Sequence, residues 1–537
     1  MQKDVSFYNQ FFSCFGPAVH SDPLRFSEIA KLCKGRVLDI GCGTGDLSDF
    51  YRGLYTGVDI SSVAIDHAKS LRRKDASFLV ADVLKGLDSS LGSFDTIVLA
   101  EFLEHIEKDE GLFEMLKNFL GEGGRLVISV PNGDRVPDES HVRIFTVPEL
   151  RKKFSHFGHV KFHRWAGFDK RILMSCDVGQ KSETSLSLAV IAKNEAKGLE
   201  NCILSCIDFV DSVAVSVDRA SIDDTFYVAE RYADVLVDYV WKDDFSLARN
   251  TLRDWIETEW ILWVDGHEFV REVPDLVEFL KNDTDGFFVR MELENGFTFY
   301  FPRLVRQSVS WKYAVHNSVE VKKPLRLEGL TIVHDRDNLQ AKEAIAIRDK
   351  QRSDMIKRLL TEEIKRGPRS SRPYFYLAQQ AFADRDFKAA VRYYKKYLRR
   401  SKHKGERWLV CYEIAYSYAL RDKYLFSVCW LHNANRELPG RWEISKMFGI
   451  VYAMAGWYKK AAKYLVDSFK ENPGVFSYGP LARNDAETWD FIGFCFYCSG
   501  DLYQARVAWK RALELCKNSD VSDVLNDRIK KLSLLVE

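Results

Sequence analysis

The sequence pattern changes along the chain, and this change limits the folds that are open to it. Before about residue 340, short β-branched runs alternate with helical patterns, which is the rhythm of parallel α/β sheets. A polar bridge, GQKSET at 179–184, divides this part into two series. After about residue 340, amphipathic helical patterns replace the strands. Since 537 residues are too many for one hydrophobic core, we predict three domains, 1–180, 184–340 and 345–537.

The two α/β series each contain five clear strand patterns. The predicted fold class is therefore α/β followed by all-α. The first series is expected at 36–40, 55–59, 78–81, 94–99 and 124–130, and the second at 186–192, 212–217, 235–239, 260–264 and 287–291.

The helical tail repeats itself. Ala415 and Tyr424 recur as Gly449 and Tyr458, 34 residues later in each case. Small residues at fixed positions let paired helices approach closely, and a period of this length resembles tetratricopeptide repeats. A helical bundle without repeats is the alternative.

Composition and charge argue against several classes of protein. The net charge is +1, so no global field attracts nucleic acid or an anionic membrane. The sequence has no apolar stretch of about 18 residues and no basic segment followed by an apolar run at its start. Its eleven cysteines are scattered, which favours reduced thiols over a zinc site. These features predict a cytoplasmic protein without a membrane span.

The segment VLDIGCGTG at 37–45 carries the first chemical signal. An apolar strand pattern ends in Asp39 and continues into a turn that contains Gly41, Gly43 and Gly45. Glycines adopt positive φ and let the backbone pass close to a ligand. This segment resembles the first motif of class I, Rossmann-like methyltransferases that use S-adenosyl-L-methionine. An NAD-binding domain would instead show GxGxxG.

Further motifs of that family follow in order. The second strand ends in Asp59-Ile60, where the resemblance implies a carboxylate on the ribose hydroxyls. The third ends in Asp82-Val83, where the adenine edge is read, and Asp39 is expected to orient the methionine end. All these residues fall at carboxyl ends of strands, where open α/β sheets bind ligands.

The methyl acceptor is predicted to be a hydroxyl. The tetrapeptide of the NPPY type that indicates N-methylation does not follow the fourth strand. His105, in an LEH sequence just after that strand, is the candidate general base, with His141 as an alternative. A packing or capping role is the competing interpretation of both histidines.

The segment LAVIAKNEAKGLENCILS at 188–205 opens a second site. It resembles the start of family 2 glycosyltransferases of the GT-A type, and the resemblance continues for more than a hundred residues. It implies that substrate is bound by residues at strand ends and on the following helices. The nucleotide sugar is assigned to Lys193, Glu195, Asp218, Arg249 and Asp265.

The metal motif departs from the family pattern. The expected Asp-x-Asp reads Asp265-Gly266-His267. An Asp-x-His motif coordinates manganese in the polypeptide N-acetylgalactosaminyltransferases, and imidazole suits transition metals better than magnesium. The predicted ligands of a divalent ion, Mn²⁺ by preference, are Asp265, His267 and His316, with His334 as the alternative third ligand.

A catalytic base is harder to assign. Asn317 stands where the resemblance implies a glutamate after His316. Glu268 and Glu320 are the substitutes that we name as catalytic candidates, and Glu292 and Glu294 are further alternatives. Inverting and retaining mechanisms both stay open.

The order of the domains suggests a function. A family 2 domain followed by tetratricopeptide helices resembles bacterial and phage transferases of the SunS-like kind, which glycosylate peptides. We therefore expect a bifunctional transferase that moves a sugar to a peptide, protein or surface glycan and O-methylates the sugar. The tail would bind the acceptor or form a homodimer. The alternatives are hypermodification of nucleic acid, and a scaffold with an inactive glycosyltransferase domain.

Overall fold

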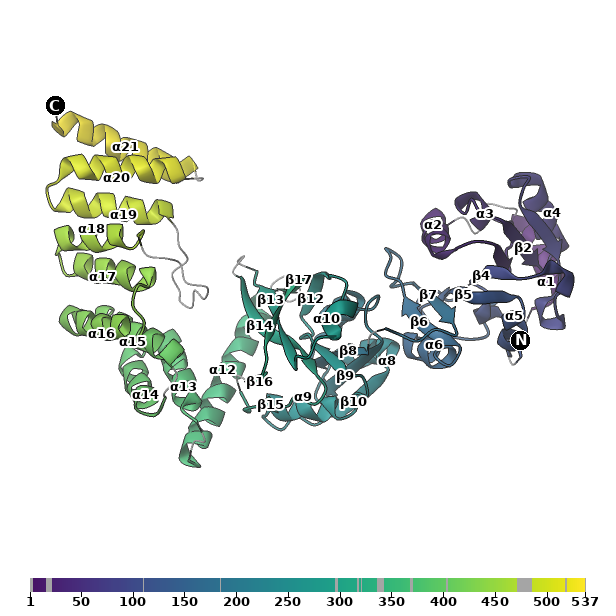
Figure 1. Ribbon diagram of the computed structural model, residues 1–537, viewed down its shortest axis with the longest axis horizontal. Coiled ribbons are helices and arrows are strands. Elements are labelled where there is room, and N and C mark those ends of the chain that lie inside the picture. The colour runs from purple at the N-terminus through teal and green to yellow at the C-terminus, as the bar shows by residue number, and fades with distance from the viewer. Residues whose placement is uncertain are drawn as a thin grey trace. The chain divides into compact units, whose positions relative to one another are not determined.

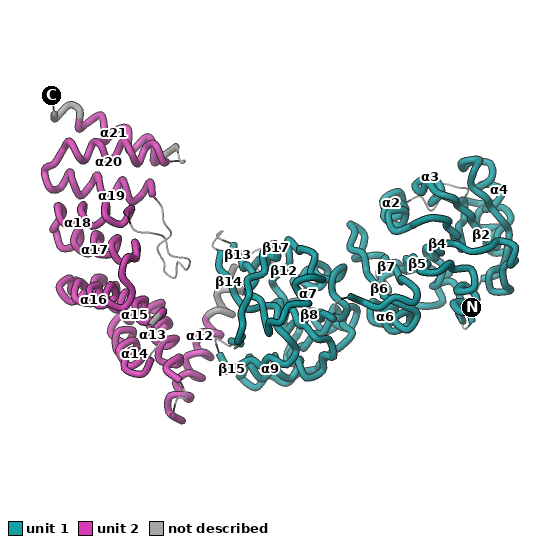
Figure 2. Tube along the Cα trace, viewed as in Figure 1, with its two compact units in different colours: residues 1–346 teal, residues 347–537 magenta. Residues whose placement is uncertain are grey.

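The computed structural model describes most of the chain as two compact units, 1–346 and 347–537 (Figure 2). The described residues are all except 1–2, 16–21, 110, 184, 295–297, 316–317, 320, 336–341, 368–369, 402–403, 471–484, 517–518 and 537.

The N-terminal part of the first unit, purple to blue in Figure 1, contains a sheet. This sheet has seven strands in the order β3-β2-β1-β4-β5-β7-β6. The first five strands run parallel, which confirms the predicted strands, whereas β6 and β7 were not predicted and pair antiparallel with their neighbours. The strands are β1 (Val37–Ile40), β2 (Tyr55–Asp59), β3 (Ser77–Val80), β4 (Phe94–Ala100), β5 (Leu120–Pro131), β6 (Gly158–Phe162) and β7 (Arg171–Val178).

Short helices connect these strands, and their ends are set by local signals. Helix α2 begins where the Asp22 carboxylate accepts a hydrogen bond from the backbone N–H of Arg25, at 3.2 Å. Helix α6 begins with a capping box between Thr146 and Glu149. The helices are α1 (Val5–Phe15), α2 (Pro23–Leu32), α3 (Leu47–Phe50), α4 (Ser62–Leu71), α5 (Leu112–Lys117) and α6 (Val147–Phe154).

A second, eight-stranded sheet follows, in the order β10-β9-β8-β11-β14-β13-β17-β12. Strands β8 to β11 pair parallel as predicted, and from β14 on the sheet is mixed. The strands are β8 (Leu186–Ala192), β9 (Ser212–Asp218), β10 (Val235–Tyr239), β11 (Trp260–Trp263), β12 (Glu268–Glu272), β13 (Gly286–Glu292), β14 (Thr298–Arg306) and β17 (Leu325–His334).

The helices of this second sheet carry several residues of the predicted site. The expected substrate residue Arg249 lies on α9, and Glu195 is the N-cap of α7. A two-stranded ribbon pairs β15 (Trp311–Lys312) with β16 (Ser318–Val319). The helices are α7 (Ala196–Leu204), α8 (Thr225–Tyr232), α9 (Phe245–Arg253) and α10 (Val277–Leu280).

The two sheets of the first unit are joined through polar contacts as well as the polar bridge. Arg231 of α8 is only 4% exposed, and it donates to the carbonyl of Asn132 and to Asp134, at 2.8 Å from the latter. The Asn132 amide donates to the hydroxyl of Tyr232 at 3.0 Å. The loop that follows β5 therefore contacts the second sheet's helices.

The second unit is helical throughout its described residues, and its helices stack side by side (Figure 1). The absence of strands there agrees with the predicted all-α tail. None of the described helices is both long and apolar enough to cross a bilayer. The helices are α12 (Lys342–Lys365), α13 (Arg372–Ala383), α14 (Phe387–Arg400), α15 (Lys404–Ala419), α16 (Tyr424–Glu437), α17 (Trp442–Met454), α18 (Tyr458–Asp467), α19 (Asp485–Cys498), α20 (Leu502–Leu515) and α21 (Ser519–Val536).

Close helix packing depends on small residues at the predicted repeat positions. A Cβ atom added at Gly449 of α17 would lie 2.4 Å from Cγ of Leu465 on α18. We expect Gly449→Ala to lower the free energy of unfolding by about 1–3 kcal/mol, because the inserted methyl group overpacks this contact. Chemical denaturation followed by circular dichroism measures the change.

Ser445→Ala on the same helix is the control, and its effect should stay within about 0.5 kcal/mol. Equal stability of the Gly449→Ala protein and the wild type would contradict the prediction. It would show that α17 and α18 can move apart to accommodate the methyl group without a loss in the free energy of unfolding.

Candidate functional sites

A cavity of about 740 Å³ opens at the carboxyl ends of the first sheet. Each predicted cofactor-binding position except Gly45 lines it, and His105 and His141 line it as well. The predicted positions in the wall are Asp39, Gly41, Gly43, Asp59, Ile60, Asp82 and Val83.

The glycine-rich turn is shaped by backbone angles that favour glycine. Gly41, Gly43 and Gly45 have φ values of 73°, 50° and 73°. A Cβ atom at Gly45 would also lie 2.5 Å from the ring of Phe78, so the turn packs directly on β3. Gly45 thus does not line the cavity, but its close packing on Phe78 fixes the turn whose other glycines do.

Two of the acidic residues are held in place by backbone N–H groups. Asp59 accepts hydrogen bonds from the N–H groups of Gly43, at 2.9 Å, and Ser61, at 2.8 Å. Asp82 accepts from the N–H of Leu84 at 3.1 Å. The carboxylates therefore have fixed positions beside the cavity, as a binding site for ligand hydroxyl and amino groups requires.

Asp39 is the most deeply buried of the three acids, with 3% exposure. One of its oxygens accepts a hydrogen bond from the Tyr55 hydroxyl, and the other has no hydrogen-bond partner among the described residues. Burial raises the pKa of Asp39 to about 7, although the Tyr55 hydrogen bond opposes this shift.

Sequence reasoning missed one wall of the cavity. Helix α1 contributes Phe7, Tyr8, Phe11 and Phe12, and its Asn9 accepts a hydrogen bond from Ser61 at 2.8 Å. The spacing of these aromatic residues, two pairs four residues apart, is the helical signal that would have indicated a shared apolar face.

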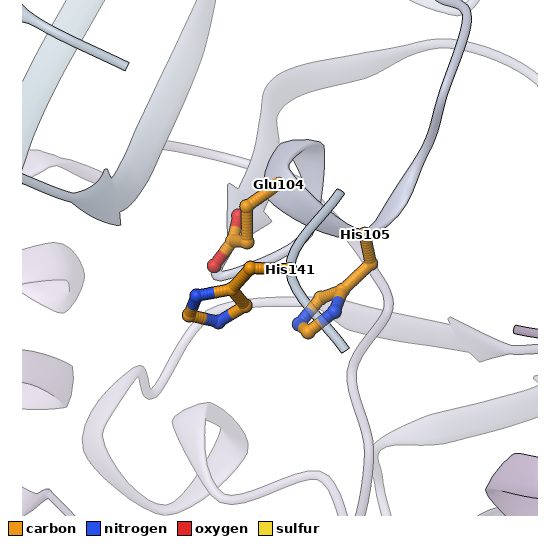
Figure 3. Close-up of side chains that lie close together, drawn as sticks. All are labelled: Glu104, His105 and His141. Carbon is orange, nitrogen blue, oxygen red and sulfur yellow. The ribbon is translucent and has the colours of Figure 1, made fainter. Parts of the chain in front are cut away.

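The structure brings His105 and His141 together in the wall of the cavity, with their ring centroids 5.1 Å apart (Figure 3). Burial lowers the pKa of His105, the contact with the Ser140 carbonyl opposes this shift, and the nearby His141 adds to it. Glu104 lies beside the two rings and is fully buried.

In the second domain, the ends of β8, β9 and β11 lie at one edge of the sheet. Lys193 and Asp218, both predicted to bind substrate, form an ion pair there with 2.6 Å between Nζ and Oδ2. Parallel neighbouring strands explain this contact, because their carboxyl ends meet.

Asp265 is surrounded by cations. Arg249 donates to one of its oxygens at 2.6 Å, and Arg303 lies 3.4 Å from the other. Burial alone would raise the pKa of Asp265, but the two arginines hold it well below its ordinary value. Arg303 also pairs with the buried Glu268 at 2.8 Å. Sequence reasoning did not identify Arg303.

The candidate metal ligands fall into a different grouping from the predicted set. His267 lies with Glu268 and His334, and one ligand atom from each is within 4.8 Å of the others. Nδ1 of His267 lies 2.9 Å from Glu195. Burial would lower the pKa of His267, but Glu195 raises it. His316 and Glu320 lie outside the described residues, so those two predictions stay predictions.

The predicted base Glu268 is engaged on both oxygens. Its Oε1 accepts from Arg303, and its Oε2 accepts from the N–H of Asp265 at 2.9 Å. This carboxylate therefore helps to shape the turn at Asp265, and its assignment as a catalytic group stays a prediction.

Comparison with known proteins assigns a family to each of the two α/β domains. Residues 19–171 match the family model described as a methyltransferase domain, and residues 187–333 match glycosyl transferase family 2. The chain therefore joins a methyltransferase domain to a family 2 glycosyltransferase domain.

Individual relatives match one domain at a time. Over 132 residues the chain is 36% identical to the ubiquinone biosynthesis O-methyltransferase of Glaesserella parasuis, which covers 22% of this chain and 56% of that protein. Over 115 residues it is 35% identical to the glycosyltransferase SunS of Bacillus phage SPbeta, which covers 19% of this chain and 27% of that protein. The chain thus spans about half of the first relative and about a quarter of the second.

The chain also has a weak likeness to solved structures. One is the plantazolicin methyltransferase BpumL in complex with a desmethylPZN analog and SAH, at 17% identity and a TM-score of 0.27, covering 32% of this chain and 88% of that one.

The protonated state of Asp39 should couple ligand binding to pH. Since its pKa is about 7, Asp39 is protonated below that pH, whereas the ammonium group of S-adenosylhomocysteine, if bound beside Asp39 as predicted, would favour the ionised form. We expect the affinity for this ligand to rise from pH 6 towards pH 8, by up to about tenfold per pH unit below the pKa. Calorimetry in buffers of different ionisation enthalpy measures the proton released. Asp39→Asn should flatten the profile, and a flat wild-type profile would contradict the assignment.

The pair of Arg303 and Glu268 should be important for stability. Arg303→Met leaves Glu268 buried and without its cation, so we expect a loss of about 3–5 kcal/mol in the free energy of unfolding. Arg271→Met is the matched control, because Arg271 is paired with Glu292 but is 43% exposed at its side chain, and we expect less than about 1 kcal/mol there. Urea denaturation compares them, and equal losses would argue against a special role for Arg303.

Proposed function

We propose that the protein is a bifunctional transferase. Its first domain transfers a methyl group from S-adenosyl-L-methionine to a hydroxyl, and its second domain transfers a sugar from a nucleotide donor to an acceptor. The observation that carries the proposal is the presence of two sites at carboxyl ends of sheet strands, each built from residues of the matched family's motifs.

The first site suits a cationic, nucleoside-containing ligand. Asp39 presents a buried carboxylate with one oxygen that no described group hydrogen-bonds, and a sulfonium or ammonium group would compensate its charge. We assign Asp59 to the ribose hydroxyls, and Asp82 with Val83 to the adenine, because backbone hydrogen bonds fix both carboxylates and all three residues line the cavity.

The second site suits an anionic leaving group. Arg249 and Arg303 supply positive charge near Asp265, and Lys193 lies beside Asp218. We assign the divalent ion, manganese by preference, to Asp265 and His267. The third ligand is either His316 or His334. The ion would neutralise the diphosphate as it leaves.

The fusion of the two domains supports a shared pathway. Linked active sites encounter each other's products at a raised effective concentration. We therefore propose that the methyl acceptor is a hydroxyl of the transferred sugar, that the sugar acceptor is a peptide, protein or surface glycan, and that the reaction takes place in the cytoplasm. The helices of the second unit would bind an extended acceptor or a second copy of the chain, as tetratricopeptide-like repeats do.

A scaffold with an inactive glycosyltransferase domain is the second candidate. It is favoured by the two arginines on Asp265, since a metal would have to share this carboxylate with them.

A donor panel separates these candidates. We expect one nucleotide sugar to raise the melting temperature of the full-length protein, with a larger shift in the presence of Mn²⁺, because ligands that bind only the native state stabilise it. His267→Ala should remove the effect of Mn²⁺, and the result with His316→Ala against His334→Ala identifies the third ligand. Adding methyl-labelled S-adenosyl-L-methionine and following the label into a glycan-containing product tests the coupling.

Three results would count against the proposal. Failure of every common donor to bind, with S-adenosylmethionine binding intact, would favour the scaffold. Label that enters a product without sugar would end the coupling hypothesis. Tight binding to duplex DNA with a steep dependence on salt would revive the nucleic-acid alternative.

A further inference from the structure

We propose that Glu104, His105 and His141 hold a divalent metal ion in the wall of the first domain's cavity, and that this ion binds the hydroxyl oxygen that accepts the methyl group (Figure 3). The second half of this inference rests on the proposed methyl transfer, whereas the ion site itself does not.

Glu104 is the main reason to place an ion here. Its side chain is fully buried, and neither carboxylate oxygen has a hydrogen-bond partner among the described residues. Carboxylates in such surroundings are normally paired with a cation or hydrogen-bonded. The two nearby arginines are held by another acid, because Arg171 donates to Glu101 at 2.9 Å and Arg25 lies 3.4 Å from it.

The two imidazoles complete a set of ligands. One ligand atom from each of the three residues lies within 4.8 Å of the others. This is close to the separation of about 3–4 Å between ligands that share one ion at about 2.1 Å. Nδ1 of His105 lies 3.3 Å from the carbonyl oxygen of Ser140. That contact assigns the proton to Nδ1 and leaves the lone pair on Nε2 for a metal.

The backbone holds these ligands in position without an ion. His105 ends the short helix η4 (Leu103–His105) after β4, and His141 lies in the loop after the neighbouring strand β5. The N–H of Val142 donates to the carbonyl of Glu104 at 2.8 Å, and the N–H of His141 donates to that of Asp138 at 3.1 Å. The loop and the helix are therefore tied together at the ligands, and little rearrangement is needed on binding.

The composition of the site points to a class of ion and of substrate. One carboxylate and two imidazoles suit first-row transition metals such as Mn²⁺, Co²⁺ or Zn²⁺. Three protein ligands leave coordination positions open, and both histidines line the cavity. The substrate class is a hydroxyl compound, and a vicinal diol of a sugar could occupy two of these positions.

The transfer step balances with such an ion. Coordination lowers the pKa of the hydroxyl, and its proton leaves to water in the cavity. The oxygen lone pair forms the new C–O bond to the methyl carbon. The C–S bond breaks, and its electron pair stays on the sulfur of S-adenosylhomocysteine. His105 then acts as a ligand rather than as the general base that the sequence suggested.

Metal retention by the full-length protein tests the site directly. Protein stripped with a chelator is dialysed against Mn²⁺, Co²⁺ or Zn²⁺ and then analysed for bound metal. The background carries Asp265→Asn and His267→Ala, so that the second domain's site does not contribute. We expect about one equivalent to be retained, and Glu104→Gln or His141→Ala to lose it. His156→Ala, an exposed histidine of the same domain, should retain the full equivalent.

Binding of S-adenosylhomocysteine by each variant shows whether the cavity is intact. Glu104→Gln keeps the shape of the side chain and removes only a buried charge, so ligand binding should be unchanged. Equal metal content in the background protein and in both variants, with each of the three ions, would overturn the site. Methyl transfer at the full rate after chelation would overturn the ion's role in the reaction. Metal retention without methyl transfer to any hydroxyl acceptor would leave the site standing and count against the proposed function.

Discussion

Carboxylates buried at the carboxyl ends of parallel strands are the constraint on which both domains are built. An ionised carboxylate loses its hydration on burial, so it needs a cation, a set of hydrogen bonds or a proton. The first domain leaves Asp39 and Glu104 with oxygens that no described group satisfies. The second domain instead surrounds Asp265 and Glu268 with Arg249 and Arg303. The carboxylates at the same location in the two α/β sheets thus have opposite surroundings: these two of the first domain have no paired cation among the described residues, and those of the second are paired with arginines.

These differences in the surroundings of the buried carboxylates agree with the charges of the proposed ligands. A site that keeps uncompensated acids favours a positively charged partner, such as a sulfonium compound or a metal ion. A site that already contains its own arginines favours a negatively charged partner, such as a nucleotide diphosphate. We therefore expect this electrostatic difference to favour different ligands at the two proposed sites, which lie inside one compact unit.

Much of the fold could be predicted because its parallel strands are short runs rich in apolar and β-branched residues. Strands β2, β8 and β10 have the predicted bounds, and the glycine-rich turn lies where its motif indicated. The later strands were harder, since β12, β14 and β17 pair antiparallel or lie near a sheet edge and carry polar residues such as Arg303. Arg303 itself lies in the strand segment TFYFPRLVR, and a charged residue on a strand normally faces solvent. Its pairing with Glu268, and the meeting of His267 with His334, depend on strand order, which local sequence does not encode.

The loop after β5 has a consequence for anyone who wishes to divide this protein. It contacts η4 near His141 and reaches α8 through Asn132 and Asp134, so it belongs to both domains. The polar bridge at 179–184 looks like a suitable boundary for expressing the two domains separately. The second domain made alone would expose Arg231 and Tyr232 to water, and the first domain made alone would expose the loop that these residues cover. The covalent linker is therefore only part of the connection. The contacts of the loop after β5 with α8 also hold the two domains together.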